Sequence, residues 1–442
     1  MPKIRAFRGL RYNLAQIGSL SDVVAPPYDV VDSSLQQQLY DNSPHNFIRL
    51  ELTKSEDTDE DPNAVYERAA ALFRQWVRDG VLQHEPDPAL YVYHQIFEYA
   101  GETYTRRGFM TTVELVRFGE GNIYPHEQTH AKAKDDRLRL TRACQANMSQ
   151  IYGLYPDPSN EAQNLLEEHI AGTAGLEAVD HLGLTHRLWP VTDQDVIGAV
   201  ANLVESKPMF VADGHHRYET ACNYRDELME AAGGELPADH PARYVLTMVM
   251  SMDDPGLIVL PTHRLIHGVN DMDSQELVSR LSSCFDCEPA GDGPEAAHEV
   301  WKQIEELDDQ GAFGLYTAKD KKWTLVTANA STPAKMQEVA GKQSADWQGL
   351  GVAILHGLII DELLGMKGHP KPNYVHLVEE VVDGLNGKLE GDDEYPIAAL
   401  VMPATVDDIR KISLHQERMP AKSTYFYPKL LSGLVVNPLD AN

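Results

Sequence analysis

Hydrophobic residues recur at intervals of three and four positions between residues 62 and 82, with Pro62 near the start and Gly80 near the end. This spacing gathers them on one side and predicts an amphipathic helix. Residues 89–118 carry two runs rich in β-branched and aromatic residues, separated by residues 100–102. That pattern predicts a β-hairpin.

The middle of the chain alternates between the two periodicities. Residues 158–205 predict a helix, a strand and a helix, and residues 209–233 predict a short apolar strand followed by a helix. Two further apolar runs, 242–252 and 256–266, are joined by the strong turn signal Asp253-Asp254-Pro255-Gly256. These two runs predict a second hairpin.

The pattern changes near residue 270. Two amphipathic helices and two strands follow, which predict a compact α+β unit, and the end of the chain predicts helix, strand and helix. The expected ranges are 274–285, 295–307, 312–318 and 321–328 for the α+β unit, then 350–364, 397–403 and 405–418.

We therefore expect an α+β protein with a mixed sheet and a smaller α+β subdomain. Its 442 residues allow two to four domains at roughly 100–200 residues each. We expect three regions, an α/β region over 1–268, a small α+β subdomain over 269–335, and a C-terminal α/β region over 336–442.

Charge and composition indicate which classes of partner the protein does not bind. The chain has 67 acidic against 38 basic residues, a net charge of −29, so its surface repels nucleic acids and anionic membranes. We expect neither as a partner. There is no run of roughly 18 apolar residues and no apolar signal-peptide core of roughly 7–15 residues. Only four cysteines are present, which fits a reducing cytoplasm.

The stretch MFVADGHHRYETA, residues 209–221, places polar chemistry at the predicted strand-to-helix turn. The start of a helix has N–H groups without helical partners and the positive end of the dipole, which suit phosphate. Glycine lets the backbone approach closely, arginine offers a bidentate fork, and histidine can move protons. We expect a phosphate site made of Asp213, Gly214, His215, His216 and Arg217, with His216 also a candidate for catalysis. Alternatively, Asp213 caps the helix and the histidines lie on the surface.

A second polar group, YPHEQTHAKAKDDRLRL, spans residues 124–140 and leads into a charged helix. Glu127 is a candidate general base or Mg²⁺ ligand, and His126 and Thr129 are candidates for substrate binding. The string from His126 to His130 also matches HExxH, a zinc-hydrolase pattern when it lies on a helix. A metal-dependent hydrolase and a merely solvated helix start are both open alternatives.

The third group lies in MPAKSTYFYPKLLSGL, residues 419–434. Amines and hydroxyls suit phosphate, and aromatic faces suit a purine ring. We therefore expect Lys422, Ser423, Thr424 and Lys429 to contact a nucleotide such as ATP or ADP. The alternative is that the aromatic residues form a core strand.

Two weaker signals complete the candidates. His263 and Arg264 follow a strand in LPTHRLIHG, and Tyr28 and Asp29 lie beside the rigid Pro26-Pro27 turn. We expect His263, Arg264 and Tyr28 to bind substrate, with Asp29 the second candidate for a catalytic carboxylate. GxxxxGK[ST], GxGxxG and GxSxG do not occur, which argues against the usual P-loop, Rossmann and α/β-hydrolase functions.

Five ordered stretches, VVAPPYDVVD, PHEQTHAKAKDDRL, FVADGHHRYETA, LPTHRL and MPAKSTYFYPKLLSGLV, together resemble a large bacterial and archaeal family, domain of unknown function 1015. The likeness covers almost the whole chain. The DGHHR segment also resembles the ParB/sulfiredoxin superfamily, where such a turn binds nucleotide phosphates. The resemblance implies a ParB/sulfiredoxin-like core and a phosphate-binding role for residues 213–217.

Members of that superfamily include free-serine kinases, sulfiredoxins and chromosome-partition CTPases. The turn here lacks the cysteine of a sulfiredoxin, and the net charge opposes a DNA-binding role. We therefore expect a small-molecule kinase that uses ATP or ADP with Mg²⁺, and the resemblance implies free L-serine as acceptor. A non-enzymatic nucleotide-sensing module that binds a protein is the main alternative. The oligomeric state is open, a homodimer included.

Overall fold

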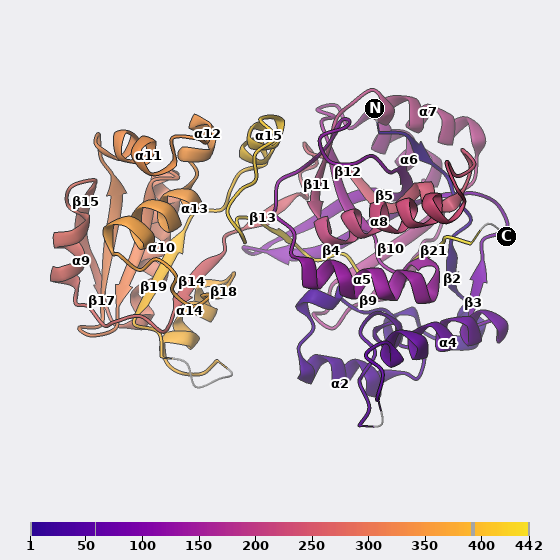
Figure 1. The fold of residues 1–442 in the computed structure, drawn as a ribbon, viewed down its shortest axis with the longest axis horizontal. Coiled ribbons are helices and arrows are strands. Elements are labelled where there is room, and N and C mark those ends of the chain that lie inside the picture. Colours follow the sequence, from indigo (N-terminus) through magenta and orange to yellow (C-terminus); the bar gives the residue numbers. More distant parts are fainter. Residues whose placement is uncertain (1, 58, 390–393, 441–442) are drawn as a thin grey trace. The chain divides into compact units, whose positions relative to one another are not determined.

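The helices and strands assemble into two units, which a computed structural model describes for residues 2–57, 59–389 and 394–440 (Figure 1). The first unit comprises Met1–Pro125, Thr129–Ile258 and Pro428–Asn442. The second comprises His126–Gln128 and Val259–Tyr427. The chain therefore returns to the first unit at its C-terminal end, so that Lys429 folds together with the N-terminal residues.

Within the described residues, a nine-stranded mixed sheet forms the centre of the first unit. Two strand pairs, β6 with β11 and β8 with β12, are parallel, and the other pairs are antiparallel. The strand order is β6 (Ile123–Pro125), β11 (Met209–Asp213), β8 (Ile151–Tyr155), β12 (Tyr244–Ser251), β5 (Glu102–Glu114), β4 (Leu90–Tyr99), β10 (Thr185–Val191) and β9 (Leu176–Val179), with β1 (Ile4–Arg5) beside β5.

Three helices pack apolar residues onto one face of this sheet, α6 (Glu161–Ile170), α7 (Gln194–Glu205) and α8 (His215–Ala231). α5 (Ala131–Cys144) lies along α8, and α4 (Ala64–Arg78) lies along α5 (Figure 1). The smaller elements of the unit are α1 (Leu14–Ile17), α2 (Ser33–Asn42), α3 (Ile48–Glu51), the 3₁₀ turns η1 (Leu20–Asp22), η2 (Tyr28–Val30) and η3 (Pro241–Arg243), and the strand pairs β2 (Leu10–Tyr12) with β3 (Leu82–His84) and β7 (Ala146–Asn147) with β21 (Asn437–Pro438).

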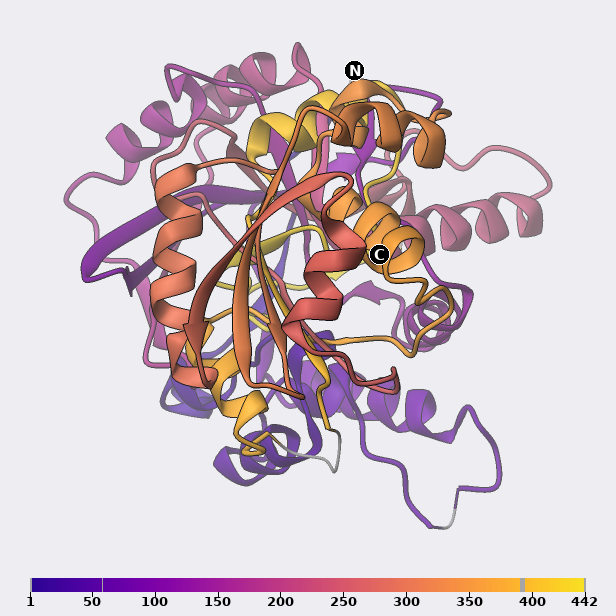
Figure 2. The ribbon, with the colours of Figure 1, turned by 90° about the vertical axis from the view of Figure 1, so that its left-hand side faces the viewer.

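The described part of the second unit contains a six-stranded antiparallel sheet with helices on both faces (Figure 2). Its order is β15 (Phe285–Asp292), β17 (Lys322–Ala328), β16 (Ala312–Thr317), β19 (Ile397–Val401), β14 (His263–Ile266) and β18 (Asn373–Val375). The remaining elements are α9 (Ser274–Leu281), η4 (Pro294–Ala296), α10 (Ala297–Leu307), α11 (Thr332–Ala340), α12 (Ala345–Gln348), α13 (Gly351–Ala353), the π-helical η5 (Ile354–Leu363), α14 (Val378–Leu385), α15 (Val406–Leu414), and the strand pair β13 (Ile258–Leu260) with β20 (Tyr425–Tyr427).

The strongly periodic segments form as predicted. The helix expected over 62–82 is α4, whose buried residues include Ala69, Phe73 and Trp76 on one side. The first hairpin is β4 and β5, and the strand and helix expected over 209–233 are β11 and α8. The protein is an α+β protein with a large mixed sheet, as its sequence pattern predicts.

The second predicted hairpin is wrong. β12 pairs with β5 on one side and β8 on the other, so neither edge is open to the apolar run that follows. That run instead crosses into the second unit, where β14 lies between β18 and β19. The chain does turn at residues 253–256, but a turn alone does not determine which strands pair.

The three regions predicted from the sequence stay a prediction. β16, from residues 269–335, and β19, from residues 336–442, are neighbours in the one sheet of the second unit. Among the described residues, none of the helices combines the length and the apolar composition needed to cross a membrane.

The turn at Gly256 provides a test of the packing in the first unit. A Cβ at this position would lie 2.6 Å from Cα of Arg106, closer than folded backbones allow. We expect Gly256→Ala to lower the free energy of unfolding by roughly 1–3 kcal/mol, because the backbone of β5 must shift. Denaturant unfolding of the full chain measures this change.

Gly198 is the matched control, because it lies exposed within α7 and a Cβ there meets nothing within 4 Å. Gly198→Ala should raise the free energy of unfolding by about 0.5–1 kcal/mol, since alanine loses less backbone entropy in a helix. Equal effects of the two substitutions would contradict the close approach at Gly256.

Candidate functional site

The predicted strand-to-helix turn is present, and its geometry depends on Gly214. β11 ends at Asp213, Gly214 has the left-handed conformation with φ of +87°, and α8 begins at the buried His215. A Cβ at Gly214 would lie 3.2 Å from the guanidinium of Arg217, so a side chain would strain the backbone and displace the arginine. α8 is 17 residues long, and the start of such a helix attracts anions.

Asp213 organises this turn and does not cap the helix. Its Oδ1 accepts the N–H of Gly214 at 2.6 Å, and its Oδ2 lies 2.8 Å from Nζ of Lys429. Nη2 of Arg217 lies 3.7 Å from Oδ1. Burial raises the pKa of the Asp213 carboxyl, but Lys429 and Arg217 outweigh burial and hold this pKa well below its usual range. Asp213 is therefore ionised, and Gly214 holds the N-cap position instead.

Arg217 lies back over the turn with 13% of its side chain exposed. Its Nη1 donates a hydrogen bond to the carbonyl of Gln150. Burial lowers the pKa of Arg217, but Asp213, Asp29 and Tyr28 outweigh burial and raise it, so the guanidinium stays charged. A permanent positive charge therefore lies beside the start of α8, as a phosphate site requires.

Tyr28 and Asp29 belong to the same group of residues. They lie in η2, and the guanidinium of Arg137 lies 4.0 Å from the centre of the Tyr28 ring. Burial raises the pKa of Tyr28, while Arg217 and Arg137 oppose the rise, so the phenol stays protonated. Asp29 is exposed, and its charge acts on both Arg217 and His216. The structure thus brings Tyr28 and Asp29 to the predicted turn.

His216 and Thr129 are tied to the loop that precedes α5. Nε2 of His216 accepts the backbone N–H of His130 at 2.9 Å, and the two rings stack with centroids 5.9 Å apart. Burial and His130 lower the pKa of His216, so this histidine is neutral at pH 7 and can accept that bond. Oγ1 of Thr129 donates to Glu219 at 2.5 Å, and Glu219 also pairs with Lys134 at 2.8 Å. His216 and Thr129 therefore link the loop before α5 to the start of α8.

Sequence reasoning missed Glu51, a carboxylate at the end of α3. It is 1% exposed, its Oε1 accepts a hydrogen bond from Oγ of Ser149 at 2.5 Å, and its Oε2 has no hydrogen-bond partner. Glu51, Arg137 and Arg217 are among the residues that line a cavity of about 30 Å³. This volume is large enough for a water molecule. A charged residue within the apolar run FIRLEL was the available signal.

Lys429 reaches Asp213 because two buried side chains hold its backbone. Gln95 of β4 and Arg106 of β5 face each other across the hairpin, and both are fully buried. Nε2 of Gln95 donates to the carbonyl of Lys429 at 2.8 Å, and Nη2 of Arg106 donates to the carbonyl of Pro428. These contacts span more than 300 residues of sequence, so no local pattern could have predicted them.

Other predicted residues lie in the second unit, around the segment 419–424. The N–H of Met419 donates to the carbonyl of His126 at 2.8 Å. Nε2 of His126 lies 2.9 Å from Oγ1 of Thr424. The segment is therefore tied to His126 at both ends.

Arg264 lies against this segment and is fully buried. Its Nη2 donates to the carbonyl of Lys422 at 2.8 Å, and its guanidinium lies 5.2 Å from the centre of the Tyr374 ring. The pKa of Tyr374 is raised, first by burial and further by the charge of Glu127, which places Glu127 near this group. Ser423 is buried, whereas the side chain of Lys422 is exposed.

His263 does not join Arg264, although the two are neighbours in sequence. Successive residues of a strand point to opposite faces. Arg264 donates a hydrogen bond to His356 of η5, whereas the ring of His263 lies edge-on to that of Trp301 of α10, with ring centroids 4.8 Å apart. Burial, followed by the charges of Arg264 and His376, lowers the pKa of His263 to about 3. Its place in the core explains His263, and we do not assign it to a substrate.

The HExxH pattern lacks the helix that zinc hydrolysis requires. β6 ends at Pro125 and α5 begins at Ala131, so His126 and His130 both precede the helix and do not lie on one helical face. Throughout residues 2–57, 59–389 and 394–440, no three His, Cys, Asp or Glu side chains are grouped to hold a metal ion. The geometry of residues 126–130 therefore does not support the metal-hydrolase alternative.

The predicted site residues thus form one group in each unit. The first unit holds Tyr28, Asp29, Thr129, Asp213, Gly214, His215, His216, Arg217 and Lys429, and the second holds His126, Glu127, Arg264, Lys422, Ser423 and Thr424.

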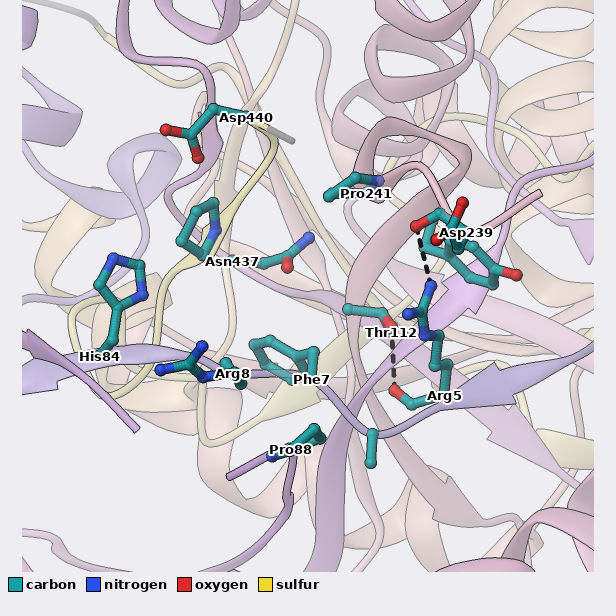
Figure 3. Close-up of a pocket in the computed structure, with 13 residues that line it drawn as sticks. Arg5, Phe7, Arg8, His84, Pro88, Thr112, Asp239, Pro241, Asn437 and Asp440 are labelled. Carbon is teal, nitrogen blue, oxygen red and sulfur yellow. Dashed lines mark hydrogen bonds between the residues drawn. The ribbon is translucent and has the colours of Figure 1, made fainter. Parts of the chain in front are cut away.

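A pocket of about 360 Å³ lies elsewhere in the first unit (Figure 3). Arg5, Arg8, His84 and Tyr244 are among the residues that line it, and Nη1 of Arg5 donates to the carbonyl of Asp239 at 2.9 Å. None of the predicted site residues lines this pocket. This pocket is therefore separate from the turn at Gly214.

Comparison with known proteins identifies a family. The family model described as a protein of unknown function, DUF1015, matches residues 4–352. No curated protein matches the sequence.

Solved structures with a similar arrangement include a free serine kinase in complex with AMP, with a TM-score of 0.31 and 12% identity over 69% of this chain and 83% of that chain. A conserved hypothetical protein from Pyrococcus furiosus matches with a TM-score of 0.32 and 12% identity, over 70% of this chain and 89% of that chain. SbnI from Staphylococcus aureus matches with a TM-score of 0.32 and 11% identity, over 75% and 87%. Likenesses this weak say nothing of this chain's activity.

The lowered pKa of Asp213 predicts how its contribution to stability depends on pH. A carboxylate whose pKa is lower in the folded protein stabilises the fold above its unfolded pKa of about 3.9, and loses this effect as the pH falls toward its folded pKa. We expect Asp213→Asn to destabilise most above about pH 4. Below that pH, the difference from the parent protein should shrink by about 1.4 kcal/mol per pH unit.

Urea unfolding between pH 3 and pH 7 provides the measurement. Asp87→Asn is the control, because Asp87 is exposed and should show little change at any of these pH values. A destabilisation by Asp213→Asn that stays constant down to pH 3 would contradict the ion pairs at the turn.

Proposed function

The chain belongs to the DUF1015 family, and we propose that this member is a nucleotide-dependent phosphotransferase that acts on a small hydroxyl substrate. The observation that carries the proposal is the pair of cations, Arg217 and Lys429, set around Asp213 at the start of α8. The helix start and the two cations offer the donors that nucleotide phosphates use in proteins. ATP or ADP is the donor that we propose.

The charge of the chain makes this turn selective. With a net charge of −29, most of the surface repels a nucleotide. Around Asp213 the excess of acidic groups disappears, because Arg217, Lys429 and Arg137 match the carboxylates of Asp213, Asp29 and Glu51. Phosphates should therefore concentrate at this turn.

The proposed reaction transfers the terminal phosphoryl group to a hydroxyl oxygen. A carboxylate takes the hydroxyl proton, the oxygen bonds to the terminal phosphorus, and the bond to the leaving phosphate of the nucleotide breaks. Arg217, Lys429 and the N–H groups of the first helical turn stabilise the charge on the transferred group. Positioning and charge stabilisation supply most of the rate in such reactions.

Mg²⁺ is proposed as the counter-ion of the nucleotide. Protein-bound Mg²⁺ usually keeps several waters and takes phosphate oxygens with one or two carboxylates. The described residues contain no group of three metal-binding side chains, so the chain fits Mg²⁺ carried on phosphates and not a resident metal. Asp29, which lies in the unit that carries the phosphate turn, is the carboxylate that we propose to contact it. Bound Mg²⁺ would neutralise phosphate charge.

Asp29 and Glu127 are the two candidates for the base. Asp29 is exposed in the unit that carries the phosphate turn, and its charge acts on Arg217 and His216. Glu127 lies in the second unit near Tyr374. His216 is neutral and accepts a backbone N–H, so we propose it as a supporting residue and not as the base. Tyr28 and Thr129, in the unit that carries the phosphate turn, are proposed for the acceptor, with free L-serine the first to test.

Arg217 provides the direct test of the phosphate turn. We expect Arg217→Ala to lower nucleotide turnover on the order of 100-fold or more, because a charged donor at the transferred group is lost. The assay incubates the full chain with ATP or ADP, Mg²⁺ and a panel of hydroxyl amino acids, and follows phosphorylated product by phosphorus NMR.

Arg142→Ala is the matched control, since Arg142 is an exposed arginine of α5 paired with Glu227. It should leave turnover unchanged. Unchanged product formation in folded Arg217→Ala would refute the proposal. Nucleotide binding without any product would favour the nucleotide-sensing regulator instead.

The base is identified by comparing Asp29→Asn with Glu127→Gln. Replacing the true base should lower kcat on the order of 100- to 10,000-fold and leave nucleotide affinity nearly unchanged, because the carboxylate acts on the hydroxyl proton. The other substitution should have a much smaller effect on kcat. Steady-state kinetics and nucleotide titration of both variants measure this difference. Full activity in both variants would exclude Asp29 and Glu127 alike as the base.

A further inference from the structure

Arg264 carries a charge that the folded chain does not balance. Its side chain is fully buried in the second unit. Among the described residues it forms no ion pair, and burial lowers its pKa to about 10, with only the phenol of Tyr374 opposing. A buried guanidinium without a counter-ion is strongly unfavourable for folding. A bound anion would supply the missing counter-ion.

The hydrogen bonds of Arg264 leave one nitrogen unused. Nε donates to Nε2 of His356 at 3.1 Å, and Nη2 donates to the carbonyl of Lys422 at 2.8 Å. Nη1 has no partner. Burial and Arg264 lower the pKa of His356 to about 3, so His356 is neutral and does not add positive charge. His356 also lies in η5, and π-helical segments are frequent at functional sites.

The segment that covers Arg264 is short and strained. Lys422 has a left-handed backbone with φ of +58°, which costs energy for a residue other than glycine. Oγ of Ser423 donates within the segment, to the carbonyl of Pro420 at 2.6 Å. Two hydrogen bonds also join the segment to His126. A ligand that replaces the Lys422 carbonyl would relieve this strain.

We propose that Arg264 binds the carboxylate of a small hydroxy acid or hydroxyl amino acid, which takes the place of the Lys422 carbonyl when residues 420–424 move aside. This proposal deepens the proposed function by naming the class of acceptor, and its link to phosphoryl transfer rests on that function.

Charge selects a carboxylate over a phosphate at this position. The guanidinium contributes one positive charge, and the groups bonded to it are a neutral imidazole and a carbonyl oxygen. One cation balances one carboxylate, whereas a phosphate dianion is better served by several cations and a helix start, as at Gly214. The negative charge of Glu127 near Tyr374 further disfavours a dianion.

The test measures binding by calorimetry to the full chain without nucleotide. The probes are L-serine and L-lactate, and each is paired with the compound that lacks its carboxylate, ethanolamine and ethanol respectively. Inorganic phosphate is the third probe. The variants are Arg264→Met, which removes the charge, and Arg264→Lys, which keeps the charge but not the fork. Arg280→Met is the matched control, because Arg280 forms an exposed ion pair with Glu276.

We expect at least one of the two carboxylates to bind, and its affinity to fall by roughly tenfold or more in Arg264→Met. Arg264→Lys should give a smaller loss and also serves if Arg264→Met does not fold. Ethanolamine and ethanol should bind far more weakly than their partners, and Arg280→Met should change nothing. Failure of both carboxylates to bind, or binding that is indifferent to Arg264, would overturn the proposal, as would Arg264-dependent binding of phosphate alone.

The same variants separate this inference from the proposed function. Carboxylate binding that depends on Arg264, with no phosphorylated product in any assay, would support the carboxylate site and count against the phosphotransferase. Phosphorylated product that forms equally well in folded Arg264→Met would do the opposite.

Discussion

The candidate chemistry of the first unit depends on the ion pair between Asp213 and Lys429. Asp213 ends β11 and could pair with Arg217 alone, which would draw the guanidinium onto the carboxylate. Lys429 instead lies 2.8 Å from Oδ2, while Nη2 of Arg217 stays 3.7 Å from Oδ1. The carboxylate is therefore shared by two cations, so neither cation is matched by Asp213 alone. Both cations lie beside the start of α8, where the helix N–H groups also favour an anion.

Three arginines with little exposed surface each donate a hydrogen bond to a backbone carbonyl. Arg217 donates to Gln150, Arg106 donates to Pro428, and Arg264 donates to Lys422. A carbonyl satisfies an N–H group without cancelling the positive charge, so these sites keep their attraction for anions. Exposed arginines such as Arg142 pair with carboxylates instead. Arginines bonded to carbonyls therefore keep a positive charge that a ligand can use, whereas the charge of arginines in surface ion pairs is already neutralised.

Local signals predicted the turn but not what completes it. The apolar run to Ala212, the glycine and the basic residues lie within a few positions of each other, so their strand-to-helix geometry could be predicted from sequence. Glu51 and Lys429 reach the same region from α3 and from the end of the chain, which only the tertiary fold determines. The wrong hairpin after β12 has the same cause, since strand pairing depends on which edges are already occupied. His263 and Arg264 are neighbours in sequence, but the period of two along a strand sends their side chains to opposite faces of β14.

The motif MPAKSTYFYPKLLSGL contributes to both groups of residues, which explains why one stretch carries so many polar side chains. Its first half, residues 419–424, covers Arg264 through the Lys422 carbonyl. Its second half enters the first unit at Pro428, where Gln95 and Arg106 fix the backbone and direct Lys429 to Asp213. The aromatic residues between these halves include buried Phe426. Core packing and ligand chemistry are therefore not competing explanations of this motif, because the buried ring of Phe426 lies between the two polar halves.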